Sequence, residues 1–217
     1  ADGTLYAAVN GDSGGVYVLD LGAGGSPERL ATILPGGNGF VNDHYADGDR
    51  LLVTESFGGT VYEIPVDEAA PDASVWVQDD LLDTPSFGAN GITRVGDDLF
   101  VSVTRATDDG GNDVGRVVRV PVNGDGSAGQ PETYVEGGRL YGADGLTARG
   151  PQLYVAVNGQ NRIARVTPSG NVRTVVEGEP LLFPSEAVFD PTDPGTLFVC
   201  NFSQDDPEAA GVLRTHP

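Results

Sequence analysis

Three oxygen-bearing side chains occupy equivalent places in three similar stretches of this chain. Asn42, Asn90 and Asp144 each lie six residues before a turn glycine, and an apolar run opens three residues after that glycine. Amide and carboxylate oxygens are hard ligands, which suit Ca²⁺ or Mg²⁺ and, less selectively, Mn²⁺ or Zn²⁺. If the fold brings the three side chains to one point, we expect them to hold one divalent cation, with Ca²⁺ favoured.

A cation held by so few protein groups keeps open coordination positions. It can then polarise a carbonyl group and lower the pKa of a bound water molecule. The chain has one Cys and two His, so it offers neither the cysteines nor the paired histidines of a dedicated zinc cage. Asp144 or a neighbouring carboxylate could take the proton of an attacking water molecule.

A second interpretation of these residues is purely structural. Asn-Gly and Asp-Gly are preferred turn pairs, so Asn90-Gly91 and Asp144-Gly145 could serve backbone geometry alone. Simple turns would fall between the strands of a hairpin, whereas here the hairpin glycine follows six residues later. This placement favours a shared site.

A fourth stretch adds two candidates for axial contacts. Ser185 holds the place of Asn42 in the last repeat and adds a hydroxyl oxygen. Its neighbour Glu186, like Asp43 beside Asn42, should alternate to the side that packs against the next sheet, where a carboxylate hydrogen-bonds rather than ligates.

Three further polar residues are candidate substrate contacts. His44 lies two residues beyond Asn42 and therefore on the same side of a regular strand, where it serves as an acid, a base, a substrate contact or a structural histidine. Thr104 and Arg105 lie in the longest repeat, whose loop could reach over a central channel. Thr104 has the alternative role of capping a turn at the end of a strand.

The elements that carry these residues form a repeat. The aligned turn glycines are spaced by 45, 48, 54 and 45 residues, at Gly3, Gly48, Gly96, Gly150 and Gly195. Periods of this length with several strands per unit are typical of β-propeller blades. One unit predicts strands over 153–157, 162–166 and 172–176, plus a short strand after Asp144. We therefore predict an all-β fold, one β-propeller domain over 1–217, built from four-stranded blades.

Five units are visible, and the two end units are incomplete. The first lacks its opening strand, and the last ends after its third. In the innermost strands of a propeller, equivalent positions converge on one axis, so Asn42, Asn90, Asp144 and Ser185 should meet there.

Composition limits the partners of this protein. The chain has 32 acidic and 12 basic residues, a net charge of −20, and no Lys. Such a surface repels nucleic acid and anionic membranes, so a small molecule is the expected partner. No stretch approaches the roughly 20 apolar residues of a membrane helix, so we expect a soluble protein. Nothing indicates its oligomeric state.

The distribution of the acidic residues favours a high-salt environment, either the cytoplasm of a halophile or an exported location. They are scattered through turns rather than gathered in a block. At high salt a short Debye length shields their mutual repulsion. Cys200, the lone cysteine, is expected to be a small core residue.

Several segments together resemble the gluconolactonase, regucalcin (senescence marker protein) and luciferin-regenerating-enzyme family over about residues 38 to 214. The blade openings that carry this resemblance are Phe40-Val41-Asn42-Asp43, Gly88-Ala89-Asn90-Gly91-Ile92, Gly142-Ala143-Asp144-Gly145-Leu146 and Phe183-Pro184-Ser185. The segments Arg119-Val120-Pro121-Val122-Asn123-Gly124-Asp125-Gly126 and Asn158-Gly159-Gln160-Asn161-Arg162-Ile163 are also similar.

The resemblance implies a six-bladed propeller with one divalent cation at the mouth of its channel. A Glu of the first blade, two Asn and one Asp would bind this cation, and Asn42, Asn90 and Asp144 match the latter three. The Glu has no counterpart because it would lie upstream of Ala1, and Glu186 is the residue that could replace it. The resemblance therefore implies either an absent N-terminal blade or a ring closed with five.

The implied activity is hydrolysis of a sugar-acid lactone or a similar small ester, with Asp144 as both metal ligand and general base. Two alternatives belong to other classes of function. One is a non-catalytic calcium- or ligand-binding propeller, and the other is an interaction scaffold, because one fold hosts many activities.

Overall fold

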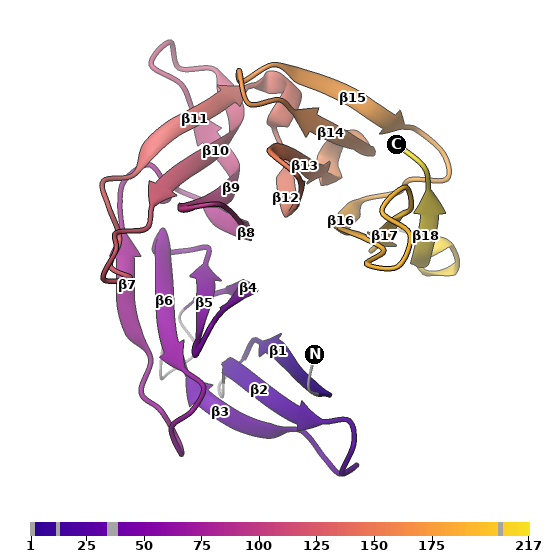
Figure 1. The fold of residues 1–217 in the computed structure, drawn as a ribbon. Coiled ribbons are helices and arrows are strands. Elements are labelled where there is room, and N and C mark those ends of the chain that lie inside the picture. Colours follow the sequence, from indigo (N-terminus) through magenta and orange to yellow (C-terminus); the bar gives the residue numbers. More distant parts are fainter. Residues whose placement is uncertain (1–2, 12–13, 34–38, 204–205) are drawn as a thin grey trace.

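The computed structural model describes residues 3–11, 14–33, 39–203 and 206–217. It is an all-β arc of five antiparallel sheets around a central axis, as the repeat predicts, and the arc is open between the first sheet and the fifth (Figure 1). Within each sheet the strands follow one another in sequence order. The β-propeller prediction is confirmed.

The first and second sheets run from the N-terminus toward the middle of the chain. The first contains β1 (Thr4–Val9), β2 (Gly15–Asp20) and β3 (Glu28–Thr32). The second contains β4 (Val41–Asp47), β5 (Arg50–Glu55), β6 (Thr60–Pro65) and β7 (Ser74–Gln78).

The remaining sheets complete the arc. The third contains β8 (Ala89–Val95), β9 (Asp98–Thr107), β10 (Asp113–Pro121) and β11 (Glu132–Gly137). The fourth contains β12 (Ala143–Arg149), β13 (Gln152–Val157), β14 (Arg162–Val166) and β15 (Val172–Glu177). The fifth contains β16 (Pro184–Phe189), β17 (Leu197–Asn201) and β18 (Gly211–Thr215).

Three short 3₁₀ helices lie in the described connections, at η1 (Gly138–Leu140), η2 (Asn158–Gln160) and η3 (Pro207–Ala209). No helix in the described part of the chain is long and apolar enough to cross a membrane.

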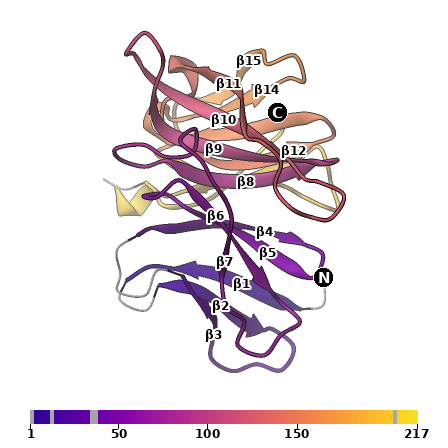
Figure 2. The same ribbon diagram turned by 90° about the vertical axis from the view of Figure 1, so that its left-hand side faces the viewer.

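The hairpin between the first two strands of each complete sheet turns at the aligned glycine. Gly48, Gly96 and Gly150 have φ values of 69°, 62° and 57°. A side chain would be strained in this left-handed conformation, which explains the glycine. Because this hairpin repeats in each complete sheet, the inner strands of these sheets begin at the same end of the molecule. In the side view the loops that connect strands lie at the two ends of the sheets (Figure 2).

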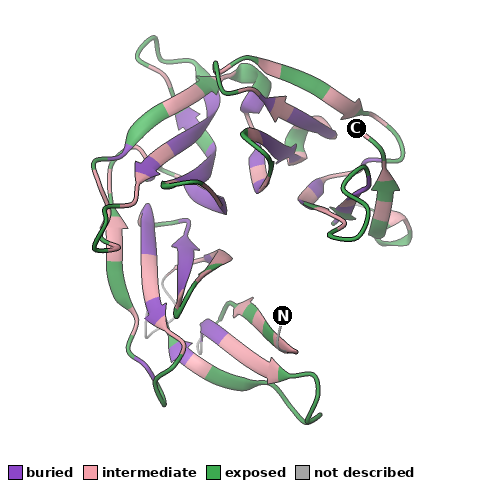
Figure 3. Ribbon diagram, in the orientation of Figure 1, coloured by how far each residue is buried: buried purple, intermediate pink, exposed green. Residues whose placement is uncertain are grey.

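The core lies between the sheets rather than within any one of them. Among the described residues, four apolar clusters join successive sheets, and none joins the fifth sheet to the first. The buried strand faces line the contacts between neighbouring sheets (Figure 3).

The two end sheets each leave an apolar face exposed. Leu5 of the first sheet is 49% exposed and Val212 of the fifth is 72% exposed. Cys200 lies on the exposed side of β17, because alternation buries Leu197 and Val199 against the fourth sheet. The prediction of a buried Cys200 is therefore wrong.

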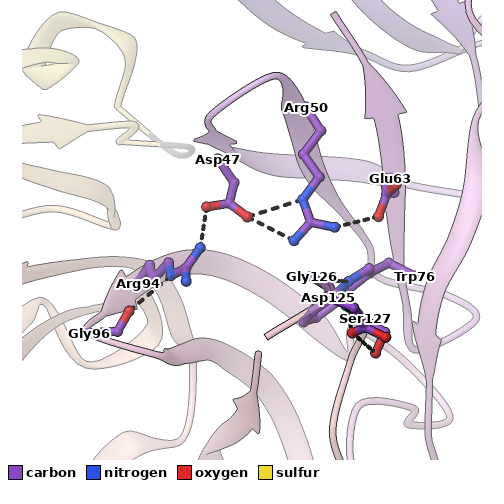
Figure 4. A network of polar contacts seen from close by, with 9 residues as sticks. All are labelled: Asp47, Arg50, Glu63, Trp76, Arg94, Gly96, Asp125, Gly126 and Ser127. Atoms are coloured by element: carbon purple, nitrogen blue, oxygen red, sulfur yellow. Dashed lines mark hydrogen bonds and ion pairs between the residues drawn. The ribbon is translucent and has the colours of Figure 1, made fainter. Parts of the chain in front are cut away.

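An ion-pair network ties the second sheet to the third at the far end of the inner strands. Asp47, at the end of β4, accepts from Arg50 at 2.8 Å and also pairs with Arg94 of β8 (Figure 4). Arg50 donates in addition to Glu63 at 2.6 Å. Burial acts to raise the pKa of Asp47, but the hydrogen bonds from the two Arg outweigh it and hold that pKa below its usual range. These residues border a surface hollow of about 780 Å³.

Candidate functional site

The candidate ligands lie in a backbone irregularity that recurs in four inner strands. The register shifts between Val41 and His44, Ala89 and Ile92, Ala143 and Leu146, and Pro184 and Glu186. Such β-bulges leave residues outside the ladder and redirect their side chains. Each bulge contains one predicted axial residue, Asn42, Asn90, Asp144 or Ser185. Because β4, β8, β12 and β16 pack against one another in succession, the four residues share one end of neighbouring strands.

Three of these residues are held by a polar partner 14 positions later, where the second strand of the same sheet ends. The hydrogen bonds are Asn42 Nδ2 to Ser56 Oγ at 3.0 Å, Asn90 Nδ2 to Thr104 Oγ1 at 2.9 Å, and Asn158 Nδ2 to Asp144 Oδ2 at 2.8 Å. The second strand therefore fixes the orientation of each side chain.

These contacts suit the chemistry of a hard cation. An amide that donates through its nitrogen turns its carbonyl oxygen to the opposite side, so Asn42 and Asn90 keep an oxygen for another partner. Asp144 accepts from Asn158 through one carboxylate oxygen, and its other oxygen has further acceptor capacity. No group of three or more His, Cys, Asp or Glu in the described chain is arranged to hold a metal ion. The candidate ligands differ from such a group, because two of them are Asn amides and one is a carboxylate.

The glycines that follow Asn90 and Asp144 are not turn residues. Gly91 and Gly145 have no positive φ, and each lies against the next sheet. A Cβ on Gly91 would lie 2.5 Å from the backbone oxygen of Asp144, and one on Gly145 would lie 2.6 Å from Cα of Glu186. Close packing of inner strands therefore explains the Asn-Gly and Asp-Gly pairs, and the turn interpretation does not.

Asp43, which follows Asn42 as Gly91 follows Asn90, has its carboxylate turned to the next sheet, as expected, although the bulge rather than regular alternation sets this direction. Its carboxylate accepts from the backbone N–H of Ile92 at 3.0 Å and of His44 at 2.7 Å. Asp43 thus links two sheets through hydrogen bonds.

The site is rich in buried carboxylates whose protonation is shifted. Burial raises the pKa of Asp144 to about 7, against the hydrogen bonds from Asn158 and Asn90. Burial, and then the charges of Asp43 and Asp144, raise the pKa of Glu186 well above its usual range. Burial also raises the pKa of Asp43. Like charges held together without water are costly, and a bound divalent cation would offset that cost.

The remaining candidates are placed as follows. His44 pairs with Val53 on the side of the first sheet, and its ring centroid lies 6.5 Å from that of Tyr6 in an edge-on contact. The bulge shifts the alternation between Asn42 and His44, so spacing does not place the two side chains on one face. Thr104 is 5% exposed and accepts from Asn90, and Arg105 is exposed at the end of the same strand.

The fourth axial position differs from the other three. Ser185 is half-buried, and Glu186 accepts from the backbone N–H of Ala187 at 2.7 Å. Neither has a counterpart of the supporting contact that Asn158 makes, because Phe202 stands at the equivalent place directly after β17.

Sequence reasoning did not assign the supporting roles of Ser56 and Asn158. The signal was present in the constant interval of 14 residues from each axial residue. Glu55 ends β5 and Asn201 ends β17, and their side chains accept from backbone N–H groups, among them those of Phe40 at 2.8 Å and Leu182 at 2.7 Å.

Comparison with known proteins finds similar folds but no matching sequence family. No family model matches the chain, and no curated protein matches it. Among solved structures, the nidogen/laminin complex aligns with a TM-score of 0.68 and 16% identity, over 100% of this chain and 76% of that one. A protein described as a "putative gluconolactonase" aligns with a TM-score of 0.66 and 17% identity, over 90% and 67%.

A catalytically inactive virginiamycin B lyase from Staphylococcus aureus, solved with quinupristin, also aligns. The TM-score is 0.53 and the identity 16%, over 93% of this chain and 62% of that one. At these identities the likeness shows the fold alone. This chain is a β-propeller whose structural neighbours include both proteins.

Proposed function

We propose that this protein is a metal-dependent hydrolase of the gluconolactonase-like kind that cleaves the ester bond of a lactone or similar small ester. The observation that carries the proposal is the fourfold bulge, which gives Asn42, Asn90 and Asp144 equivalent places on adjacent inner strands. One divalent cation, Ca²⁺ in first place, would be held by these three residues. When bound, it would polarise the substrate carbonyl and acidify water.

The protein residues supply positioning and proton transfer. Asp144 takes a proton from the attacking water as the water oxygen bonds to the carbonyl carbon, and the ester C–O bond then breaks. The same proton passes from Asp144 to the alkoxide oxygen that leaves, so a lactone gives one hydroxy acid and an open-chain ester gives a carboxylic acid and an alcohol. Asn158 holds the carboxylate in place through this exchange. Without metal the pKa of Asp144 is about 7, and a bound cation would lower it and favour the ionised form that accepts the proton.

One observation favours a second candidate, an interaction propeller. A chain of the nidogen/laminin complex, a structure of two proteins bound to each other, aligns over the whole of this chain. In that case the axial residues would bind a structural ion, so that metal removal lowers stability with no turnover to lose, or they would serve packing only, so that metal removal changes neither.

The test is lactone hydrolysis by protein stripped of metal with chelator and then restored with Ca²⁺, Mg²⁺, Mn²⁺ or Zn²⁺. We expect turnover to require restoration. Asp144→Ala should lower kcat by a factor of at least about 10³, because the base and one ligand are lost together. Ser185→Ala serves as the matched control and should retain most of the activity. Equal activity in Asp144→Ala and wild type would remove Asp144 from the mechanism, and metal-independent stability without turnover would favour the scaffold.

A further inference from the structure

Buried hydroxyl groups cross from one sheet to the next beside the axial residues. Thr54 on β5 and Ser102 on β9 each lie 12 positions after the axial residue of their own sheet, Asn42 and Asn90. Thr54 Oγ1 donates to the C=O of Asn90 at 2.6 Å, and Ser102 Oγ donates to the C=O of Asp144 at 2.5 Å. Both side chains are 0% exposed. Each hydroxyl therefore holds the backbone of the next axial residue from the neighbouring sheet.

The bulges explain why these carbonyl groups need a donor from outside their own sheet. Asn90 and Asp144 lie between the paired positions of their inner strands, so the ladder of their own sheet does not include them. A buried carbonyl without a partner costs free energy, and a hydroxyl satisfies it only over a narrow range of distances. Thr54 also accepts from the N–H of Asp43 at 3.0 Å, so it joins the backbone next to Asn42 to that of Asn90.

A second kind of link joins the orientation of one candidate ligand to the backbone of the next sheet. Ser56 Oγ accepts from Asn42 Nδ2 at 3.0 Å and donates to the C=O of Ala89, the residue before the next axial residue, at 2.6 Å. Asn10, directly after β1, binds the corresponding residue of the second sheet. Its Nδ2 donates to the C=O of Val41 at 2.9 Å, and its Oδ1 accepts from the N–H of Val41 at 2.7 Å.

These links follow the candidate ligands from sheet to sheet. At Asn42, Asn90 and Asp144, a side chain of the preceding sheet holds the backbone of the axial residue or of the residue before it. The place 12 positions after Asp144 is Ala156, which has no hydroxyl to offer the next axial residue, Ser185. The strand β16 also has a bulge, so a need to satisfy bulge carbonyls would place a hydroxyl there too. The pattern favours a role in placing the ligands.

We propose that Thr54 and Ser102 are positioning residues, which set the affinity of the axial site for a divalent cation by fixing the spacing of Asn42, Asn90 and Asp144. The proposal rests on the metal site of the proposed function and adds the residues that shape it. The three ligands belong to three sheets, so the distances between them depend on the spacing of the sheets. Metal sites tolerate only small displacements of their ligands, and loss of a contact that supports a ligand typically weakens metal binding by about 10- to 100-fold.

The experiment measures the dissociation constant of Ca²⁺ by isothermal titration calorimetry on protein stripped of metal with chelator. Asp144→Ala removes a ligand and so identifies the axial binding event among weaker binding to the acidic surface. Thr54→Val keeps the shape of the side chain without its hydroxyl, and Ser102→Ala removes the other hydroxyl. We expect each of these two to raise the dissociation constant at least about tenfold. Thr54→Ser keeps the hydroxyl and should stay within about threefold of wild type.

Thr196→Val is the matched control for the loss of a buried hydroxyl. Thr196 is 4% exposed, lies before β17 at the end of the fifth sheet away from its bulge, and donates to Asp193 Oδ2 at 2.8 Å. Urea unfolding of the metal-free proteins should show a loss of stability in this variant, in Thr54→Val and in Ser102→Ala, whereas Ca²⁺ affinity should fall only in the latter two. Equal Ca²⁺ affinity in all of them means that the hydroxyls are purely structural and overturns the proposal. Thr54→Val decides the question if Ser102→Ala does not fold.

Binding and turnover together separate this proposal from the hydrolase proposal. If the two variants lose Ca²⁺ affinity but the wild type hydrolyses no lactone, the hydrolase proposal fails and the positioning role stands. If lactone is hydrolysed with Ca²⁺ bound but the variants keep wild-type affinity, the positioning role fails and the hydrolase stands. A wild-type protein that binds no divalent cation at the axial site overturns both.

Discussion

At the residue scale, Asp144 combines a buried position with partners that favour its charged form. Burial is the largest influence and raises the pKa of Asp144 to about 7, while Asn158 and Asn90 act in the opposite direction. The charge of Asp43 adds to the rise. In the folded protein without metal, Asp144 therefore binds its proton more tightly than in the unfolded chain.

The consequence is a dependence of stability on pH with a definite sign. Since the folded pKa exceeds the unfolded value, the metal-free protein should lose stability as pH rises from about 4 to 7, by up to about 4 kcal/mol from Asp144 alone. Asp144→Asn should reduce this fall, with Glu186 and Asp43 carrying the remainder. Denaturant unfolding at pH 4, 5.5, 7 and 8.5 measures it, with exposed Asp109→Asn as the control.

Added Ca²⁺ should reverse the trend, because a bound cation favours ionised Asp144. Its stabilising effect should be larger at pH 8 than at pH 5. A metal-free protein whose stability is the same at all four pH values would contradict the burial of Asp144.

At the element scale, the recurring bulge allows an inner β-strand to direct one polar side chain toward the axis. Regular alternation would give each inner strand two faces, both committed to packing against neighbouring sheets. The bulge frees Asn42, Asn90 and Asp144 from that pattern, and the residue after each is turned to the next sheet. Where the strands approach closely, only glycine fits, and Gly91 and Gly145 fill that role.

This close approach predicts a large cost for a single methyl group. Gly91→Ala places a Cβ 2.5 Å from backbone atoms of β12, so the inner strands must separate, and we expect a loss of at least about 2 kcal/mol of unfolding free energy. Gly124→Ala, at an exposed position with open space around it, should change stability by less than about 0.5 kcal/mol. Urea denaturation of the two variants provides the comparison, and a Gly91→Ala protein as stable as wild type would contradict the observed packing.

At the scale of the whole molecule, most of the negative charge has no cationic partner. The ion pairs of the described residues use four Arg and five carboxylates. The chain has 32 acidic residues and a net charge of −20. Most of the acidic side chains in the described part of the chain therefore repel one another without a cationic partner, and this repulsion opposes the compact ring.

We expect molar KCl to raise the melting temperature. The Debye length falls from about 30 Å at 0.01 M to about 3 Å at 1 M, so repulsion between neighbouring turns is screened. A cation at the axial site would also stabilise, but that effect saturates with its dissociation constant at fixed KCl. Thermal melts over a KCl series with and without chelator separate the two, and a flat melting temperature would exclude adaptation to high salt.

The local pattern of the chain was sufficient to predict the propeller. Turn glycines at positive φ, such as Gly48 and Gly150, and alternating apolar runs act over a few residues, so their spacing predicted the strands and the incomplete end sheets. The predicted strand over 162–166 is β14, and that over 172–176 lies within β15. The equivalence of Asn42, Asn90 and Asp144 could be predicted for the same reason, because each lies at the same distance in sequence from its turn glycine.

Other properties depend on what the ring places next to each residue, and only the tertiary structure decided them. The bulge redirected His44 toward Tyr6, and the exposed face of the fifth sheet left Cys200 uncovered. The ring of Phe40 contacts that of Phe87 across 47 positions of sequence, and the pKa of Asp144 reflects burial and charges from other sheets. Periodicity describes each strand by itself, whereas burial, close contact and electrostatic coupling arise between strands that are distant in the chain.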